Sequence, residues 1–243
     1  MAIEILDRRP WRVTTYVPNE RETQTLGGNQ THASIGMNLY QTLRTYAARL
    51  GVLWLVRFET DLRYPRTDGT TGVFYPDVFM APDMAIDNEK PYEVNVVGRP
   101  PALVVEIASK KTVGRDVGPK REAYAEMGVE EYLTFDPRPR KRLALYGYRL
   151  VGPGRYREIP RAPEGGLWLN TVGLRVLAEA PTKALDGPLL RLATREGERL
   201  LHVDEEAEAR RTERHRRQVA EQARDAAQAE IARLRALLGE STP

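Results

Sequence analysis

The stretch PALVVEIAS, residues 101–109, contains an acidic side chain inside an apolar run. The segment from Leu103 to Ile107 is typical of a buried β-strand, and Glu106 interrupts it. A carboxylate that is buried without a partner either becomes protonated or destabilises the fold. The chain must therefore fold so that Glu106 meets a cation, a metal ion or another polar group.

A second acid, Asp77, lies inside the apolar segment VFYPDVFMA, directly after Pro76. Proline cannot donate to a strand ladder, so it belongs at a sheet edge, a strand start or a bulge. If the two segments are neighbouring strands, Asp77 and Glu106 lie roughly 5 Å apart and repel each other. A shared Mg²⁺ ion would remove that repulsion, because Mg²⁺ binds one or two carboxylates and completes its shell with water or phosphate oxygens. Mn²⁺ would substitute for it.

Phosphodiester hydrolysis also needs a group that stabilises negative charge or positions the attacking water, and lysine is the usual one. Position 108 is alanine, which leaves Lys110, if the strand continues, or Lys120 in the first turn of the next predicted helix. A cation in that turn opposes the helix dipole. A solvated surface lysine is the ordinary alternative for Lys120.

The order of elements indicates an α/β or α+β domain, a mixed sheet flanked by helices, over residues 1–192. Apolar spacing predicts one helix at 31–50, and Pro119 and Gly128 favour a second at 118–128. The expected strands are 52–62, 72–81, 101–109 and 131–137, followed by a hairpin from 142–150 and 155–159.

Residues 200–243 form a second, charged region, in which 204–238 contains neither Gly nor Pro and predicts one long helix. An apolar seam runs along its C-terminal half and consists of Ala220, Ala223, Ala227, Ile231, Leu234 and Leu238. We expect a coiled coil or another subunit contact there, and hence a homo-oligomer formed through this helix, the sheet domain or both. A solvated, partly frayed tail is the alternative.

The composition limits the classes of partner and compartment. The chain has no cysteine, so any metal must be held by carboxylates or imidazoles, and a cytoplasmic location is expected. No apolar stretch approaches the length that spans a bilayer, and the N-terminus lacks an apolar signal region. A net charge of +3 indicates only a weak preference for binding polyanions such as nucleic acids.

Three signatures follow one another along the chain: PD at 76–77, ALVVEIAS at 102–109, and D-x-x-x-K-x-x-x-Y-x-x-x-G-V-x-E-Y from Asp116 to Tyr132, with DP closing the series at 136–137. Over residues 30–150 this series resembles the Uma-two family, a restriction-endonuclease-like branch of the PD-(D/E)xK nuclease superfamily. The resemblance implies a sheet flanked by helices, with Asp77 and Glu106 as Mg²⁺ ligands. Ala108 departs from the superfamily pattern, and the family's shift of the lysine to the next helix selects Lys120 over Lys110.

The function expected from this resemblance is metal-dependent endonucleolytic hydrolysis of DNA. Asp77, Glu106 and Lys120 are the catalytic candidates. The alternative is a nuclease fold without activity that serves as an oligomeric interaction or DNA-binding module. A glycosidase would also use two carboxylates, but aromatic residues are only 7% of the chain, too few for typical sugar platforms.

Five further residues are weaker candidates for the site: His32, Glu59, Lys110, Asp116 and Tyr124. His32 begins the first helix, where family members often carry a histidine, although a capping or surface role is the simpler interpretation. Glu59 shares a strand face with Asp61, and pairing of these acids with Arg57 or Arg63 is the alternative. Asp116 is a candidate N-cap of the Lys120 helix, and Tyr124 would orient Lys120 or simply contribute to packing.

Overall fold

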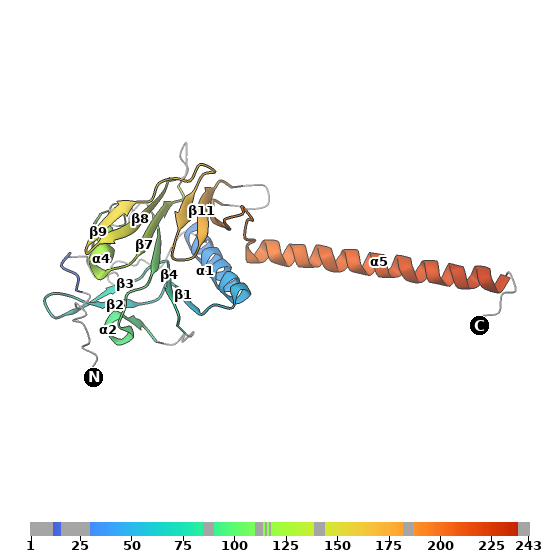
Figure 1. Ribbon diagram of the computed structural model, residues 1–243, viewed down its shortest axis with the longest axis horizontal. Coiled ribbons are helices and arrows are strands. Elements are labelled where there is room, and N and C mark those ends of the chain that lie inside the picture. Colours follow the sequence, from blue (N-terminus) through green and yellow to red (C-terminus); the bar gives the residue numbers. More distant parts are fainter. Residues whose placement is uncertain are drawn as a thin grey trace, which may run out of the picture. The chain divides into compact units, whose positions relative to one another are not determined.

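The computed structural model describes residues 12–15, 30–84, 90–109, 114, 116, 118–138, 144–181 and 187–237 (Figure 1). The chain divides into two compact units, Met1–Leu200 and Leu201–Pro243. The second unit contains one long helix, α5 (Val203–Leu237). Within the described residues, no helix combines the length and the apolar character needed to cross a bilayer.

The first unit combines three helices with twelve strands in its described part. The helices are α1 (Gln30–Leu50), α2 (Val94–Val97) and α4 (Pro119–Met127). The strands are β1 (Trp54–Phe58), β2 (Leu62–Pro65), β3 (Thr71–Phe74), β4 (Val78–Pro82), β5 (Tyr92–Glu93), β6 (Leu103–Ile107), β7 (Glu131–Asp136), β8 (Ala144–Gly152), β9 (Arg155–Glu158), β10 (Leu167–Leu169), β11 (Leu174–Glu179) and β12 (Leu189–Ala193).

A six-stranded sheet with the order β1-β4-β6-β7-β8-β9 forms the centre of this unit. Only β6 and β7 run parallel, and α4 lies between them in the chain as the crossover helix. The other neighbours in the sheet are antiparallel. The predicted fold class, a mixed sheet flanked by helices, is confirmed.

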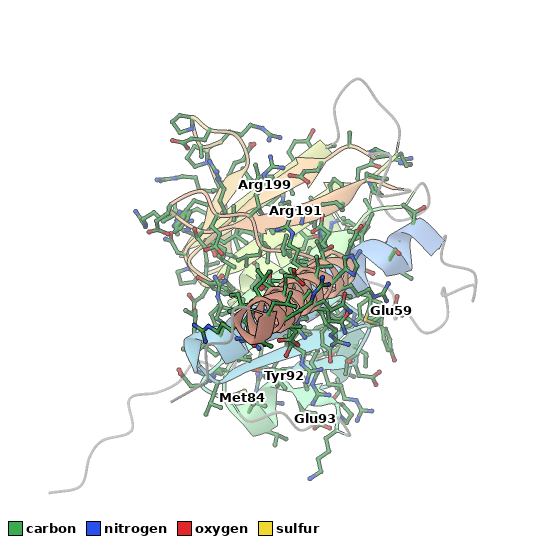
Figure 2. All side chains as sticks on the ribbon, turned by 90° about the vertical axis from the view of Figure 1, so that its right-hand side faces the viewer. Glu59, Met84, Tyr92, Glu93, Arg191 and Arg199 are labelled. Atoms are coloured by element: carbon green, nitrogen blue, oxygen red, sulfur yellow. The ribbon has the colours of Figure 1, made fainter. Side chains whose placement is uncertain are left out.

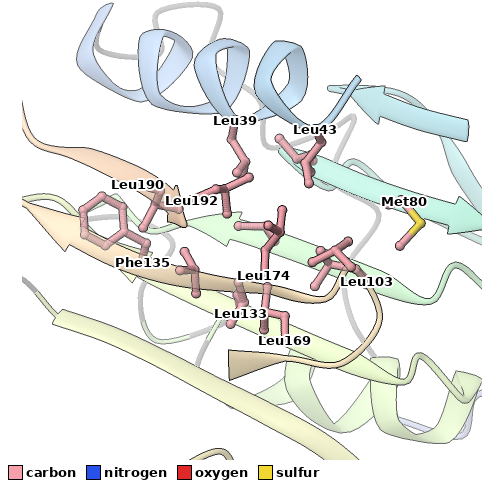
Figure 3. Packing of buried hydrophobic residues seen from close by; sticks show 14 of the residues in the cluster. Leu39, Leu43, Met80, Leu103, Leu133, Phe135, Leu169, Leu174, Leu190 and Leu192 are labelled. Carbon is pink, nitrogen blue, oxygen red and sulfur yellow. The ribbon is translucent and has the colours of Figure 1, made fainter. Parts of the chain in front are cut away.

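The main apolar core lies between α1, one face of the central sheet and a second sheet of order β10-β11-β12 (Figure 3). Leu39 and Leu43 reach into it from α1, Leu103 and Leu133 from the central strands, and Leu174 from β11. The four-residue spacing of Leu39 and Leu43 puts both on the same side of α1, which explains why this helix covers the sheet.

A second cluster lies on the opposite face of the central sheet, where α4 packs. It includes Val104 of β6, Tyr132 of β7, and Tyr124 and Met127 of α4. Val105, one residue after Val104, belongs to the first core instead. Because side chains alternate along a strand, Glu106 shares the face of Val104 and points to the side of α4.

Two of the predicted strands are broken in the structure, and both breaks are corrections to the sequence analysis. Segment 52–62 stops at Phe58, because Glu59 has a positive φ of 45° and ends the extended conformation. Segment 72–81 divides into β3 and β4 around Pro76, which has no N–H for a ladder. The separated strands β2 and β3 form a third, small sheet together with β5.

The last strands, β10 to β12, were not expected from the sequence. They are short apolar segments of three, six and five residues, which periodicity alone cannot assign. Their strand β12 extends past residue 192, the predicted end of the globular domain. The predicted helices at 31–50 and 118–128 and the hairpin of β8 and β9 are present as expected.

Candidate active site

Asp77 directly precedes β4, and Glu106 lies on the neighbouring strand β6. Strands β4 and β6 are antiparallel, and Val78 is paired with Val105. One step further along this register, Asp77 stands opposite Glu106, so both side chains belong to the same region of the sheet. Both residues are buried, with 8% of Asp77 and 3% of Glu106 exposed.

Asp77 makes two short contacts that fix its carboxylate. The backbone N–H of Ile107 donates to Oδ2 of Asp77 at 2.6 Å, so an acid side chain replaces a strand carbonyl as the acceptor. Oδ1 of Asp77 lies 3.1 Å from Nε2 of His32, near the start of α1. Asp77 thus links α1 to the end of β6.

The electrostatic environment of His32 favours its charged form. The polar contact with Asp77 raises the pKa of His32, although partial burial of the ring acts in the opposite direction. The negative charge of Glu59 contributes in the same sense as Asp77, with a smaller effect. The structure therefore places His32 beside Asp77, and not in a purely solvent-exposed position.

Glu106 is in contact with two side chains of α4. Nζ of Lys120 lies 3.2 Å from Oε1 of Glu106, and both side chains are 4% exposed. The hydroxyl of Tyr124 donates to the same oxygen at 2.8 Å. Lys120 and Tyr124 are one turn apart and lie on one side of the helix, which is why both reach the strand that α4 covers.

Asp116 joins this group from the segment before α4. Its Oδ1 is 3.4 Å from Nζ of Lys120, and Asp116 is 1% exposed. The prediction that Asp116 caps α4 is wrong, because the N-cap is Gly118 and no side chain makes a capping hydrogen bond there. Lys120 thus lies between two carboxylates, which offsets the unfavourable position of a cation in the first turn of a helix.

Aromatic rings hold the α4 side of the site in place. The ring of Tyr124 lies 4.7 Å from that of Phe74 and 5.2 Å from that of Tyr132. The hydroxyl of Tyr132 donates to the backbone carbonyl of Asp116 at 2.7 Å. Burial raises the pKa of Tyr132 well above its usual value, and the charge of Glu106 adds to this. Tyr132 therefore remains protonated and anchors Asp116.

The boundaries of α4 follow from its sequence. Pro119 occupies the first turn, where its missing N–H costs nothing, and Gly128 ends the helix in the left-handed conformation with φ 91°. These two signals place Lys120 at the start of the helix.

Glu59 contributes a third acid near Asp77. It lies at the bend after β1 and is labelled in Figure 2. Its backbone N–H donates to the carbonyl of Asp77 at 3.1 Å. Burial raises the pKa of Glu59, and the negative charge of Asp77 raises it further. Its predicted companion Asp61 lies 3.4 Å from Arg63, as the ion-pair interpretation expects.

The structure brings together most of the residues that the sequence singled out. Around the Asp77–Glu106 pair it gathers His32, Glu59, Asp116, Lys120 and Tyr124. The last candidate, Lys110, lies outside the described residues. No residue pattern predicted the Ile107 N–H donor, although Pro76 indicated that the ladder is interrupted at this point.

The donor set fits a hard cation. Asp77 and Glu106 offer carboxylate oxygens, the ligands that Mg²⁺ and Mn²⁺ prefer. In the described part of the chain, no three His, Asp or Glu side chains form a ready-made metal cage. A metal at this site would therefore be held by the two acids and completed by water or phosphate oxygens, which is the usual arrangement for Mg²⁺.

Comparison with known protein families gives a match over most of the chain. The family model Uma2, whose description is "Putative restriction endonuclease", matches residues 4–180, well over half of the chain. The matched range includes all elements that build the site, from α1 to β7. Among curated proteins, none matches this chain.

Proposed function

The chain belongs to the Uma2 family, and from this membership and the geometry around Glu106 we propose that it is a metal-dependent endonuclease that hydrolyses DNA phosphodiester bonds. Membership in a family of this description indicates a nuclease. The dependence on Mg²⁺, the DNA substrate and the roles of individual residues are our proposal.

One observation carries the proposal most directly. A buried lysine, Lys120, reaches the carboxylate of Glu106 at 3.2 Å, and the strand register places Asp77 opposite Glu106. A buried cation beside paired acids is expensive to maintain for stability alone, because desolvation of each charge opposes their attraction. Such groups are concentrated at functional sites.

Each residue has a distinct role in this proposal. Asp77 and Glu106 bind the metal, and a bound Mg²⁺ would polarise the scissile phosphate and lower the pKa of an attacking water. Lys120 stabilises the negative charge that develops on the phosphate, or positions the water. Tyr124 and Asp116 hold Lys120 and Glu106 in place, while His32 orients Asp77.

A plasmid-nicking assay tests the proposal. Supercoiled DNA is incubated with Mg²⁺ or Mn²⁺ and with the wild type, Asp77→Asn or Glu106→Gln. We expect metal-dependent nicking by the wild type and a loss of at least about a hundredfold in each variant, the size of effect that follows from removing a few kcal/mol of transition-state stabilisation. Both substitutions keep the side-chain volume and an oxygen acceptor.

Asp68→Asn is the matched control, because Asp68 is an exposed acid that accepts hydrogen bonds from the nearby Thr70. It is expected to nick like the wild type. If wild type and both site variants are equally inert over a broad panel of DNA substrates, the nuclease proposal fails. The interaction-module alternative would then account for the fold.

A further inference from the structure

Helix α5 exposes an apolar stripe along its C-terminal half. Val219, Ile231, Leu234 and Leu237 are 51%, 50%, 48% and 72% exposed, respectively. Exposed alanines lie on the same side of the helix at helical spacing: Ala220, Ala223, Ala226 and Ala227. Leu238, which belongs to the seam expected from the sequence, lies outside the described residues. A long helix of this polarity gains most of its stability by packing such a stripe against a partner.

The stripe changes in width along the helix. Between residues 220 and 229 its apolar members are all alanines, whereas Ile231, Leu234 and Leu237 follow in the last two turns. A parallel pair of copies would place alanine against alanine and leucine against leucine, and the two axes would have to diverge, because interhelix distance depends on side-chain size. An antiparallel pair centred near Gln228 places Ile231 and Leu234 of one copy against the alanine-lined segment 222–226 of the other.

The charges of α5 favour the same orientation. Residues 210–217 contain five arginines and one glutamate, and Glu230 lies within the apolar stripe. A parallel pair would place the arginine-rich segments side by side and would bring Glu230 against Glu230. In an antiparallel pair centred near Gln228, the two arginine-rich segments are about 40 Å apart, given a rise of 1.5 Å per residue. This exceeds the screening length of roughly 8 Å at physiological salt.

We propose that residues 219–237 of α5 bind the same residues of a second copy of this chain in an antiparallel arrangement. The large-to-small gradient and the charge distribution are both complementary to themselves under a twofold rotation, which an isologous dimer contact requires. The arginine-rich segment 210–217 lies outside the overlap. This assembly does not depend on the proposed nuclease activity.

Cysteine cross-linking of the full chain tests the orientation, and the chain has no native cysteine to interfere. Val219→Cys and Leu237→Cys are prepared with different affinity tags, mixed and oxidised. An antiparallel pair gives disulfides between the two different variants and none within either variant. A parallel pair gives the reverse, since residues 219 and 237 are then about 27 Å apart along the helix. Disulfides confined to like variants, or absent altogether, would overturn the proposal.

Two arginine substitutions test whether the stripe is the interface. Ala227→Arg places a charge in the stripe, whereas Gln228→Arg places the same charge on a neighbouring exposed position outside it. Analytical ultracentrifugation is expected to show self-association at least about tenfold weaker for Ala227→Arg and unchanged for Gln228→Arg. Circular dichroism verifies that both variants keep their helix. Equal association of the two variants, or a monomeric wild type at all concentrations, would refute the contact.

Discussion

Glu106 on β6 and Glu131 on β7 are buried acids on two adjacent strands, yet they are held in different ways. They are 3% and 1% exposed, so burial does not distinguish them. Neither does the sequence, because both stand in the series of signatures that characterises the chain. Their partners do distinguish them, and this difference separates a structural acid from a candidate catalytic one.

The carboxylate of Glu131 accepts hydrogen bonds from two backbone N–H groups, a hydroxyl and a guanidinium. The backbone N–H groups of Asn170 and Thr171 donate to it at 3.0 Å each, and the Thr171 hydroxyl donates at 2.6 Å. Arg149, its cross-strand neighbour on β8, contributes an N–H at 2.9 Å. Glu131 thus fastens the connection between β10 and β11 to the central sheet. A comparable ionic contact occurs next to the separate β10-β11-β12 sheet, where Arg191 and Arg199, both labelled in Figure 2, contact Glu179 of β11.

Glu106 is instead in contact with side chains that can exchange protons or move. The ammonium of Lys120 and the hydroxyl of Tyr124 approach the same oxygen. Neither is a backbone donor fixed by secondary structure. For this pair of glutamates, the acid that contacts ionisable side chains of α4 is the candidate catalytic one, and the acid that binds an arginine and the donors of the β10–β11 connection supports the fold.

The largest expected effect is the loss of stability in Glu131→Gln. The amide cannot accept from the full set of donors around it, and its own NH₂ faces N–H groups. Removing one partner of a buried ionic network costs on the order of 3 kcal/mol in the free energy of unfolding. Urea denaturation followed by circular dichroism measures this change.

Nicking activity per folded molecule should be unchanged in Glu131→Gln, since the residue does not contact the Asp77–Glu106 site through any of these hydrogen bonds. A stable Glu131→Gln variant that has lost nicking would contradict the division into structural and catalytic acids.

The Glu106–Lys120 pair is expected to show a smaller effect on stability. Glu106→Gln keeps an acceptor for Tyr124, and Lys120 keeps its contact with Asp116, so the loss should be about 1–2 kcal/mol. Lys120→Met should lose a similar amount. The double variant should be more stable than the sum of the two losses predicts, by about 1 kcal/mol, because the side chain at position 106 is then neutral and does not need the charge of Lys120.

The nicking activity of the same three variants is compared with their stability. Stability is expected to return in part in the double variant, whereas activity is expected to stay at the level of the worse single variant. Activity that rises together with stability would show that the pair acts only by supporting the fold.

The elements with strong local signals could be predicted from the sequence. Helix α4 has a proline at its start and a glycine at its end, and α1 has a regular apolar face. Strand β6 is a continuous apolar run around Glu106. These three elements are also the ones that position the site. Residue spacing left Lys110 and Lys120 as alternative partners of Glu106, and the family resemblance selected Lys120.

Other features depend on contacts that are distant in the sequence. The left-handed conformation of Glu59 is unusual for a residue with a side chain, and nothing in the surrounding apolar pattern indicates it. Asp116 has the residue type of a helix cap, but its contact with Lys120 and the anchoring hydroxyl of Tyr132 appear only in the folded chain. The role of Glu131 likewise rests on residues about forty positions away.

A third acid, Glu126 near the end of α4, extends the comparison to a half-buried position and gives the smallest expected effect. Its carboxylate accepts from the backbone N–H groups and the hydroxyls of Thr14 and Thr15, at 2.6 to 2.9 Å. Partial burial acts to raise the pKa of Glu126, but these hydrogen bonds outweigh it, and the pKa is lowered. Because it accepts hydrogen bonds from backbone N–H groups and hydroxyls, as Glu131 does, we interpret Glu126 as a structural acid that attaches segment 12–15 to α4.

Because the pKa of Glu126 is lower in the folded than in the unfolded chain, its ionised form stabilises the fold at pH values above the unfolded pKa. That contribution is lost as the pH falls through the lowered folded pKa. Glu126→Gln should therefore cost no more than about 1 kcal/mol at neutral pH, since solvent screens this site. The cost should shrink on acidification below about pH 4, near the unfolded pKa of a glutamate. Parallel urea titrations of both proteins at several pH values measure this difference, and a difference independent of pH would mean that packing of segment 12–15, and not the charge of Glu126, holds it to the helix.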